Sequence, residues 1–344
     1  MGARSTNPTQ SFFDDFFRSG TEASGSNVPG PVSVTGGDAT FTYNSKKIHV
    51  FTSSGALTVV GGSVSLEVFM IGGGGGGGGY CGGGGGAGGL VTHADITCNE
   101  GPNSVVIGTG GARRSNGTDT TFLGMTAKGG GHGAEGGGAG GAHSPGGSGG
   151  GGGSGPGGGG SGNATQPSQN SPFTPDPNFA QYGNAGGSVS GSGGNYSSNG
   201  GGGAGGAGDS NPNGGPGGDG GAGRQIPTTF RDPSNTYGGA GPGSPYGWFG
   251  GGGGGSNSTN GGAPSDGSAL GAGGQGPNRT TPYSGGGGAG QTTAPGAATI
   301  NPISGHANTG GGGGGGEVVP GTPAPTGNPL GNGGSGIVMV AFDV

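Results

Sequence analysis

Apolar and polar residues alternate in several short segments of residues 38–71, which is the pattern of β-strands with one buried face. Turn-forming residues separate these segments at positions 44–46, 53–55 and 61–62. A second cluster predicts strands at residues 90–92, 96–97 and 105–107. We therefore expect a small, β-sandwich-like lead-in over residues 38–125.

The apolar signal almost disappears after residue 125 and returns only at the end of the chain. Residues 336–342 again have the apolar character of a sheet strand. A strand at this position needs strand partners, and the candidates lie in the lead-in. The pattern therefore predicts one glycine-rich body over residues 126–344, closed by a strand at 336–342.

Uninterrupted glycine runs are the dominant feature of the chain. The first run directly follows the apolar residues 66–71, and the main runs are residues 72–79, 82–86, 149–153, 157–160, 200–203, 250–255, 285–288 and 310–316. Ordering glycine costs more backbone entropy than ordering any other residue, so an isolated run is a flexible linker. Runs in a polyproline-II-like conformation have about three residues per turn and no internal hydrogen bonds, so each peptide group needs a lateral partner. We expect the runs to pack together as a polyglycine-II helical bundle, giving a mainly β protein with a glycine-rich sandwich body.

Composition narrows the class of protein further. Glycine makes up 110 of 344 residues without a sustained Gly-X-Y register, which excludes collagen. Only 25% of residues are hydrophobic, too few for an ordinary core, so disorder is the competing interpretation. Ten basic residues and a net charge of −6 argue against nucleic-acid binding. The chain has no apolar stretch long enough to cross a membrane, and its first residues lack the order of a secretory signal.

Residues 1–37 form a separate N-terminal docking segment and linker. Phe12, Phe13, Phe16 and Phe17 fall on one face of a predicted short helix, which cannot bury them by itself. They suit a groove on another protein, which makes residues 1–30 the expected docking site. The alternative is that this segment folds back on its own domain.

Most other aromatic residues lie between the glycine runs, in segments rich in proline, serine, threonine and asparagine. This composition is typical of binding loops held by a rigid scaffold. The candidate contact residues are Phe173, Tyr237, Tyr246, Trp248, Phe249 and Tyr283. We expect Tyr246, Trp248 and Tyr283 to be exposed; the alternative is that the rings cap the ends of the glycine layers.

Candidate chemistry is sparse. His132 and His143 have no nearby nucleophile, no acidic pair suggests a glycosidase, and the Gly-x-Gly-x-x-Gly matches follow from composition. The chain is therefore expected to have no enzymatic activity, no cofactor and no metal site. Cys81 and Cys98 are the only cysteines, and they form either a disulfide or two free, half-buried thiols.

Several blocks occur in an order that resembles the glycine-rich domain of phage fibre and adhesin proteins. They are residues 49–59, 68–72, 105–111, 116–122 and 333–340. The resemblance covers about residues 39–344, and the architecture is similar to that of the tip adhesin of T-even-like long tail fibres. The N-terminal phenylalanine segment departs from that adhesin, so the mode of attachment is not implied.

The resemblance implies a virion structural protein for viral attachment, made in the host cytoplasm and carried on the exterior of the particle. Its partners would be other virion proteins of the tail, fibre or capsid, and a protein or glycan receptor on the host surface, in a possibly oligomeric assembly. The first alternative is a capsid decoration or head-fibre protein. The second is an ice-binding polyglycine-II protein, although the bulky aromatic segments argue against it.

Overall fold

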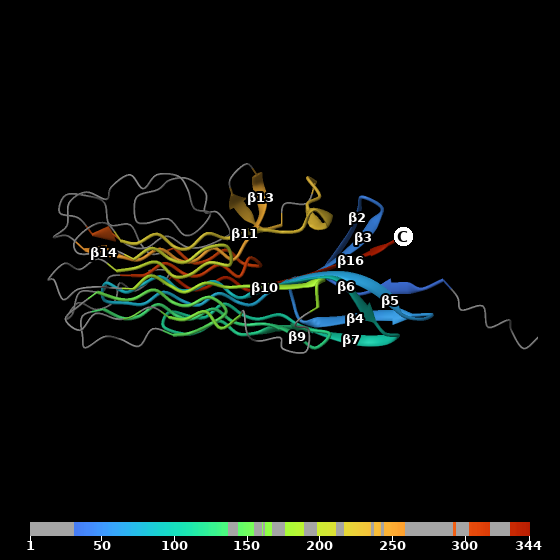
Figure 1. Cartoon of the computed structure of the whole chain (residues 1–344), viewed down its shortest axis with the longest axis horizontal. Coiled ribbons are helices and arrows are strands. Elements are labelled where there is room, and N and C mark those ends of the chain that lie inside the picture. Colours follow the sequence, from blue (N-terminus) through green and yellow to red (C-terminus); the bar gives the residue numbers. More distant parts are fainter. Residues whose placement is uncertain are drawn as a thin grey trace, which may run out of the picture.

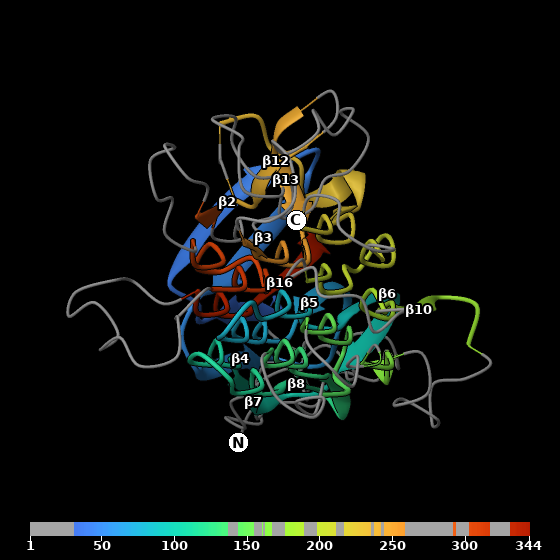
Figure 2. The same cartoon turned by 90° about the vertical axis from the view of Figure 1, so that its left-hand side faces the viewer.

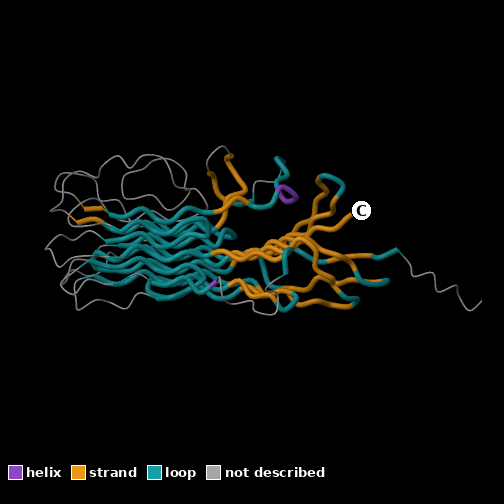
Figure 3. The backbone as a smooth tube through the Cα atoms, in the orientation of Figure 1, coloured by secondary structure: helices purple, strands orange, loops and turns teal. Residues whose placement is uncertain are grey.

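The computed structural model describes residues 31–136, 144–154, 160, 162–166, 176–188, 198–210, 217–234, 237–241, 244–258, 292–293, 303–316 and 331–344. This part of the chain is mainly β, with antiparallel sheets and a short 3-10 helix, η3 (Thr228–Phe230). Most strands gather at one end, and the glycine-rich segments extend from them side by side toward the short parallel pair of β14 (Asn257–Ser258) and β15 (Thr292–Thr293) (Figure 1, Figure 3). The predicted β-rich class is confirmed.

Two antiparallel sheets form the β end. The five-stranded sheet has the order β1-β4-β7-β8-β9, with bounds Ser33–Thr35, Gly55–Val60, Gly101–Val106, Thr120–Phe122 and Met125–Ala127. The six-stranded sheet has the order β10-β6-β5-β16-β3-β2, with bounds Phe179–Tyr182, Leu90–Cys98, Val64–Ile71, Ile337–Asp343, Lys46–Phe51 and Ala39–Tyr43. The three predicted turns of residues 38–71 separate β2, β3, β4 and β5 as expected. The predicted break within residues 90–97 is absent, because β6 is one continuous strand. The irregularity lies in its pairing with β5, where the register shifts between Leu66 and Val68.

The closing strand lies in the middle of the six-stranded sheet. In β16, Val340 pairs with Val68 of β5 on one side and with His49 of β3 on the other. Its first six residues are buried, which explains why the segment is apolar on both faces. The prediction of a terminal strand at 336–342 that returns to the start of the chain is confirmed, with a shift of one residue.

The six-stranded sheet separates two hydrophobic clusters, and β16 contributes to both. Val338, Val340 and Phe342 face the cluster shared with the five-stranded sheet. Ile337, Met339 and Ala341 face a second cluster, whose outer members Ile226, Phe230 and Phe249 come from the glycine-rich half of the sequence. The two halves of the chain therefore share one core.

The glycine-rich segments form an array joined by backbone hydrogen bonds in a three-residue period. Successive N–H groups of residues 72–78 donate to three different neighbours in turn, at N–O distances of 2.8–3.0 Å. Gly72, Gly75 and Gly78 donate to residues 83–89, which run back along the array. Gly73 and Gly76 donate to residues 115–118, and Gly74 and Gly77 donate to residues 331–334. The array thus includes residues 72–89 and 108–118 of the predicted lead-in as well as the predicted body.

Close backbone approach leaves no room for a side chain at most glycine positions of the array. A Cβ on Gly75 would overlap the carbonyl of Gly131, and a Cβ on Gly77 would overlap that of Gly314. The first run ends where Tyr80 and Cys81 adopt positive φ angles of 53° and 58°, which reverses the chain. These glycines are needed for contact between neighbouring backbones, as at the axis of collagen.

The carboxylate of Asp38 makes the stability of the β end depend on pH. Its carboxylate accepts hydrogen bonds from the backbone N–H groups and hydroxyls of Thr52 and Ser53, at 2.7–3.0 Å. Burial raises the pKa of the Asp38 carboxyl, but hydrogen bonds from Ser53 and Thr52 outweigh it, and the pKa lies below its usual value.

A depressed pKa in the folded state stabilises the protein above the pKa of the unfolded state, and this contribution is lost as the pH falls through the folded value. We expect Asp38→Asn to lower the unfolding free energy at pH 7 by less than about 1 kcal/mol, because the site is exposed. The difference from the parent protein should shrink toward pH 2–3. Urea unfolding of the parent and variant at pH 7 and at pH 2–3 measures this difference in stability. A difference that did not change with pH would contradict a lowered pKa for Asp38.

Candidate functional site

A three-stranded sheet carries the candidate contact residues that the structure describes. It consists of β11 (Arg224–Gln225), β13 (Ser244–Phe249) and β12 (Gly239–Gly241), in that order. It stands beside the glycine array, near its junction with the six-stranded sheet (Figure 1, Figure 2). Residues 242–249 were expected to be a loop, and the structure corrects this because residues 244–249 form β13.

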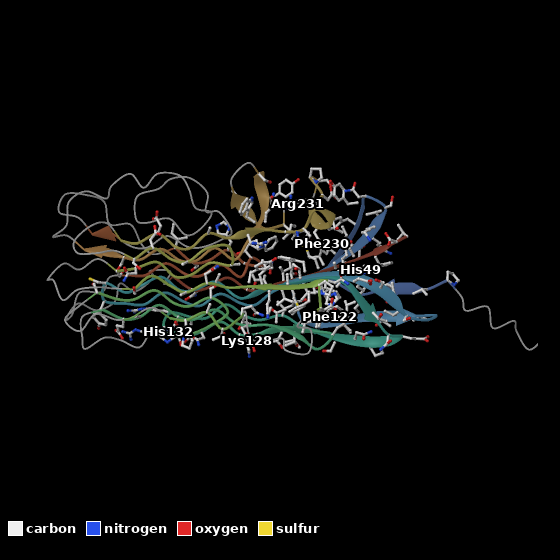
Figure 4. The ribbon with its side chains drawn as sticks, viewed as in Figure 1. His49, Phe122, Lys128, His132, Phe230 and Arg231 are labelled. Carbon is white, nitrogen blue, oxygen red and sulfur yellow. The ribbon has the colours of Figure 1, made fainter. Side chains whose placement is uncertain are left out.

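The two faces of β13 have different roles. Phe249 is fully buried, and its ring centroid lies 4.8 Å from that of Phe69 in an edge-to-face arrangement. The expectation that Phe249 contacts a receptor is therefore wrong. Its ring joins the glycine-rich half of the chain to the six-stranded sheet, in the cluster that also contains Phe230, which Figure 4 labels.

Tyr246 and Trp248 alternate with the buried residues of β13 and are half-buried. The Trp248 ring lies against Gly241, where any Cβ would collide with it. Its indole Nε1 is buried and has no hydrogen-bond partner within the described part of the chain. The hydroxyl of Ser244 donates to the carbonyl of Tyr246, at 2.8 Å. This arrangement holds two large rings in place at the surface, neither of them fully exposed.

The remaining candidate residues divide into two groups. Tyr237 is half-buried and packs against the second hydrophobic cluster, so it supports β13 as well as reaching the surface. In β11 of the same sheet, the Arg224 guanidinium lies 3.7 Å from the centroid of the Tyr182 ring. The other predicted contact residues and the docking phenylalanines lie outside the described residues; they are Phe12, Phe13, Phe16, Phe17, Phe173 and Tyr283.

Two of the described histidines lie in contacts within the protein. His93 is buried, and its Nε2 lies 3.3 Å from a carboxylate oxygen of Asp176. His132 has its Nδ1 3.0 Å from the carbonyl of Gly133 and lies on the outside of the array (Figure 4). Among the residues that the structure describes, no three histidine, cysteine or acidic side chains gather where they could hold a metal ion.

The two cysteines do not form a disulfide with each other. Both Cys81 and Cys98 are buried, Cys81 at the reversal of the first glycine run and Cys98 at the end of β6. Burial raises the pKa of the Cys98 thiol, which disfavours the reactive thiolate.

Sequence reasoning missed a pair of adjacent arginines, Arg113 and Arg114, in a turn beside the first glycine run. Their guanidinium groups have different surroundings: Arg114 forms an ion pair with Glu135, whereas Arg113 lies against the backbone of Gly79. The available signal was the occurrence of two neighbouring arginines in a chain with only ten basic residues.

No protein-family model matches the sequence, and no curated protein matches it. In the described ranges, no helix has the length and apolar character required to cross a membrane.

Proposed function

We propose that this protein is a phage virion fibre or adhesin subunit without enzymatic activity, which presents surfaces held by a glycine array to the host cell. The observation that carries the proposal is the three-residue hydrogen-bond period of residues 72–78. A single glycine run has no core, but a run bonded to three neighbours has most of its peptide groups satisfied laterally. Such an array is a stiff scaffold that suits a protein exposed outside a cell.

The same observation supports a polyglycine-II bundle as the detailed form of the array. Three different bonding directions in three successive residues match a helix with about three residues per turn. A cluster shared by the five-stranded and six-stranded sheets likewise supports a β-sandwich at the other end. The sandwich closes the array by holding both its first and last segments, through β5 and β16.

Tyr246 and Trp248 are the described residues best suited to contact a host receptor. Large aromatic rings held rigidly at a surface supply contact area at low entropic cost, and such residues dominate binding energetics. We expect Trp248→Ala with Tyr246→Ala to weaken host adsorption by at least about 30-fold, because a single hot-spot residue contributes roughly 2 kcal/mol or more. Adsorption of purified protein to host cells measures this.

Val60→Ala is a matched control, because Val60 is 56% exposed on the five-stranded sheet and belongs to neither cluster. Circular dichroism must show that the double variant keeps the parent fold. Undiminished adsorption by a folded double variant would contradict the contact role and favour a capsid decoration protein.

The N-terminal docking proposal is tested by deletion. Residues 1–30 precede the described part of the chain, and four phenylalanines at about 1.5–3 kcal/mol each would suffice to anchor it to another virion protein. A protein lacking residues 1–25 should fold with the parent melting temperature and fail to join the particle. Particle composition after complementation with the truncated gene measures this, and normal incorporation would refute docking through this segment.

A further inference from the structure

The turn at residues 112–115 carries Arg113 and Arg114 and lies against the second half of the first glycine run, residues 72–79. The Ser115 N–H donates to the Ala112 carbonyl at 2.9 Å, which closes the turn. The Arg114 N–H donates to the Gly77 carbonyl at 3.1 Å, which fastens the turn to the run. Since the run starts where β5 ends, Gly77 lies toward the end of the array that is remote from the five-stranded and six-stranded sheets (Figure 1).

Arg114 has partners within the protein. Its guanidinium forms an ion pair with Glu135 from the neighbouring segment of the array. It also lies over the ring of Tyr80, 5.6 Å from the centroid. The positive charge of Arg114 is therefore balanced, and its side chain holds Tyr80 and Glu135 together.

Arg113 differs from its neighbour. Its backbone N–H donates to the side-chain oxygen of Asn332 at 3.2 Å, but its guanidinium has no hydrogen bond or ion pair among the described residues. The guanidinium lies against Gly79, where a Cβ would collide with it. Burial, and then the charge of Arg114, lower the pKa of Arg113. An arginine remains protonated even so, which leaves a half-buried cation whose guanidinium donors have no acceptor in the part of the chain that the structure describes.

We propose that Arg113, flanked by Tyr80 and Arg114, binds the carboxylate or phosphate group of an anionic saccharide on the host surface. The planar guanidinium presents two parallel N–H groups that match either anion. The half-buried Tyr80 ring supplies an adjoining surface of the kind that carries sugar faces. The proposal rests on the proposed function, because it names the ligand class of a host-binding protein.

The charge balance of the site selects its ligand. Glu135 neutralises Arg114, so the group formed by Arg113, Arg114 and Glu135 has one net positive charge. This suits a single anionic group, and the chain's net charge of −6 opposes a polyanion such as a nucleic acid. The charge balance therefore favours a saccharide with one acidic group over a polyanionic one.

Arginine side-chain NMR of the full chain tests the site. Glucuronic acid and glucose 1-phosphate serve as the carboxylate and phosphate probes, and glucose serves as the neutral control. We expect a saturable shift of the Arg113 Nε–H resonance with at least one acidic probe and none with glucose. Arg113→Gln should weaken binding about tenfold, whereas Arg224→Gln, at the cation–π contact with Tyr182, should leave it unchanged.

Equal shifts with glucose, or unchanged binding by a folded Arg113→Gln protein, would overturn the proposal. The titration uses no host cells, so its failure is distinguishable from failure of the proposed function. A parent protein that binds acidic sugars without adsorbing to cells would contradict the adhesin proposal alone. Normal adsorption without any sugar response would contradict the saccharide site alone.

Discussion

Gly75→Ala is expected to destabilise the protein by about 3 kcal/mol or more, and Gly313→Ala is expected to do the same. The new Cβ would overlap the carbonyl of Gly131 at the first site and that of Gly331 at the second. Inserting one methyl into a well-packed core costs roughly 1–3 kcal/mol when side chains can adjust. Here the obstructing atoms belong to a backbone that is hydrogen-bonded on several sides, so relief requires separating whole segments.

Two other glycines provide matched controls for this substitution. A Cβ on Gly206, at the edge of the array, would come no closer than 3.5 Å to Ala222, and a Cβ on Gly55 no closer than 3.9 Å to Phe51. Neither has a positive φ, so alanine fits both positions. Alanine also restricts the unfolded chain, which should make these variants neutral or more stable by about 0.4–1 kcal/mol.

Denaturant unfolding followed by circular dichroism measures all four variants. The comparison isolates the close approach of the backbones, because the chemical change is the same at every position. If Gly75→Ala and Gly206→Ala had equal stabilities, the lateral contacts of the array would not be a source of its stability.

Phe249→Ala is expected to have the second largest effect, a loss of about 3–5 kcal/mol. The ring is fully buried against Phe69 and belongs to the cluster that joins β13 to the six-stranded sheet. Its removal leaves a cavity between the two halves of the chain, in a protein whose apolar content is only 25%. Each large ring in such a core carries an unusual share of its stability.

Phe249→Leu retains most of the buried volume and should lose clearly less than Phe249→Ala. Val60→Ala, at an exposed site, should change the unfolding free energy by less than about 0.5 kcal/mol. Thermal and denaturant unfolding of the three variants supply the measurements. A Phe249→Ala protein as stable as the Val60→Ala protein would show that the second cluster does not hold the array to the sheet.

Alternation and turn chemistry were sufficient to predict the strands of the β end. The segments that became β2, β3, β4 and β5 have period-2 patterns. Asn44 and Ser45 separate β2 from β3, and Gly61 and Gly62 separate β4 from β5, all at positive φ angles. The closing strand β16 was predictable for the same reason, because six of its seven residues are buried. Local sequence determines these elements since burial of one or both faces leaves a direct mark on residue type.

β13 illustrates where such patterns fail. Pro245 and Gly247 interrupt its apolar residues, which is typical of a loop in sequence. In the structure Gly247 adopts a positive φ of 80°, and β13 pairs with Gln225 and Gly239 on its two sides. Which ring of this segment faces the core depends on those partners, so Phe249 could not be distinguished from Trp248 beforehand.

The sequence by itself determined that this chain has β-strands at both ends of a glycine-rich body, with too few apolar residues for an ordinary core. It could not determine which glycine runs are neighbours, because the runs are chemically identical and contain no side chains to select a partner. The tertiary structure decided this by anchoring the first run to β5 and the glycine-rich residues 331–336 to β16, and the two segments bond to each other from Gly74 and Gly77. The same anchoring placed Arg113 against Gly79 without an acidic partner among the described residues, a relationship that only distant contacts create.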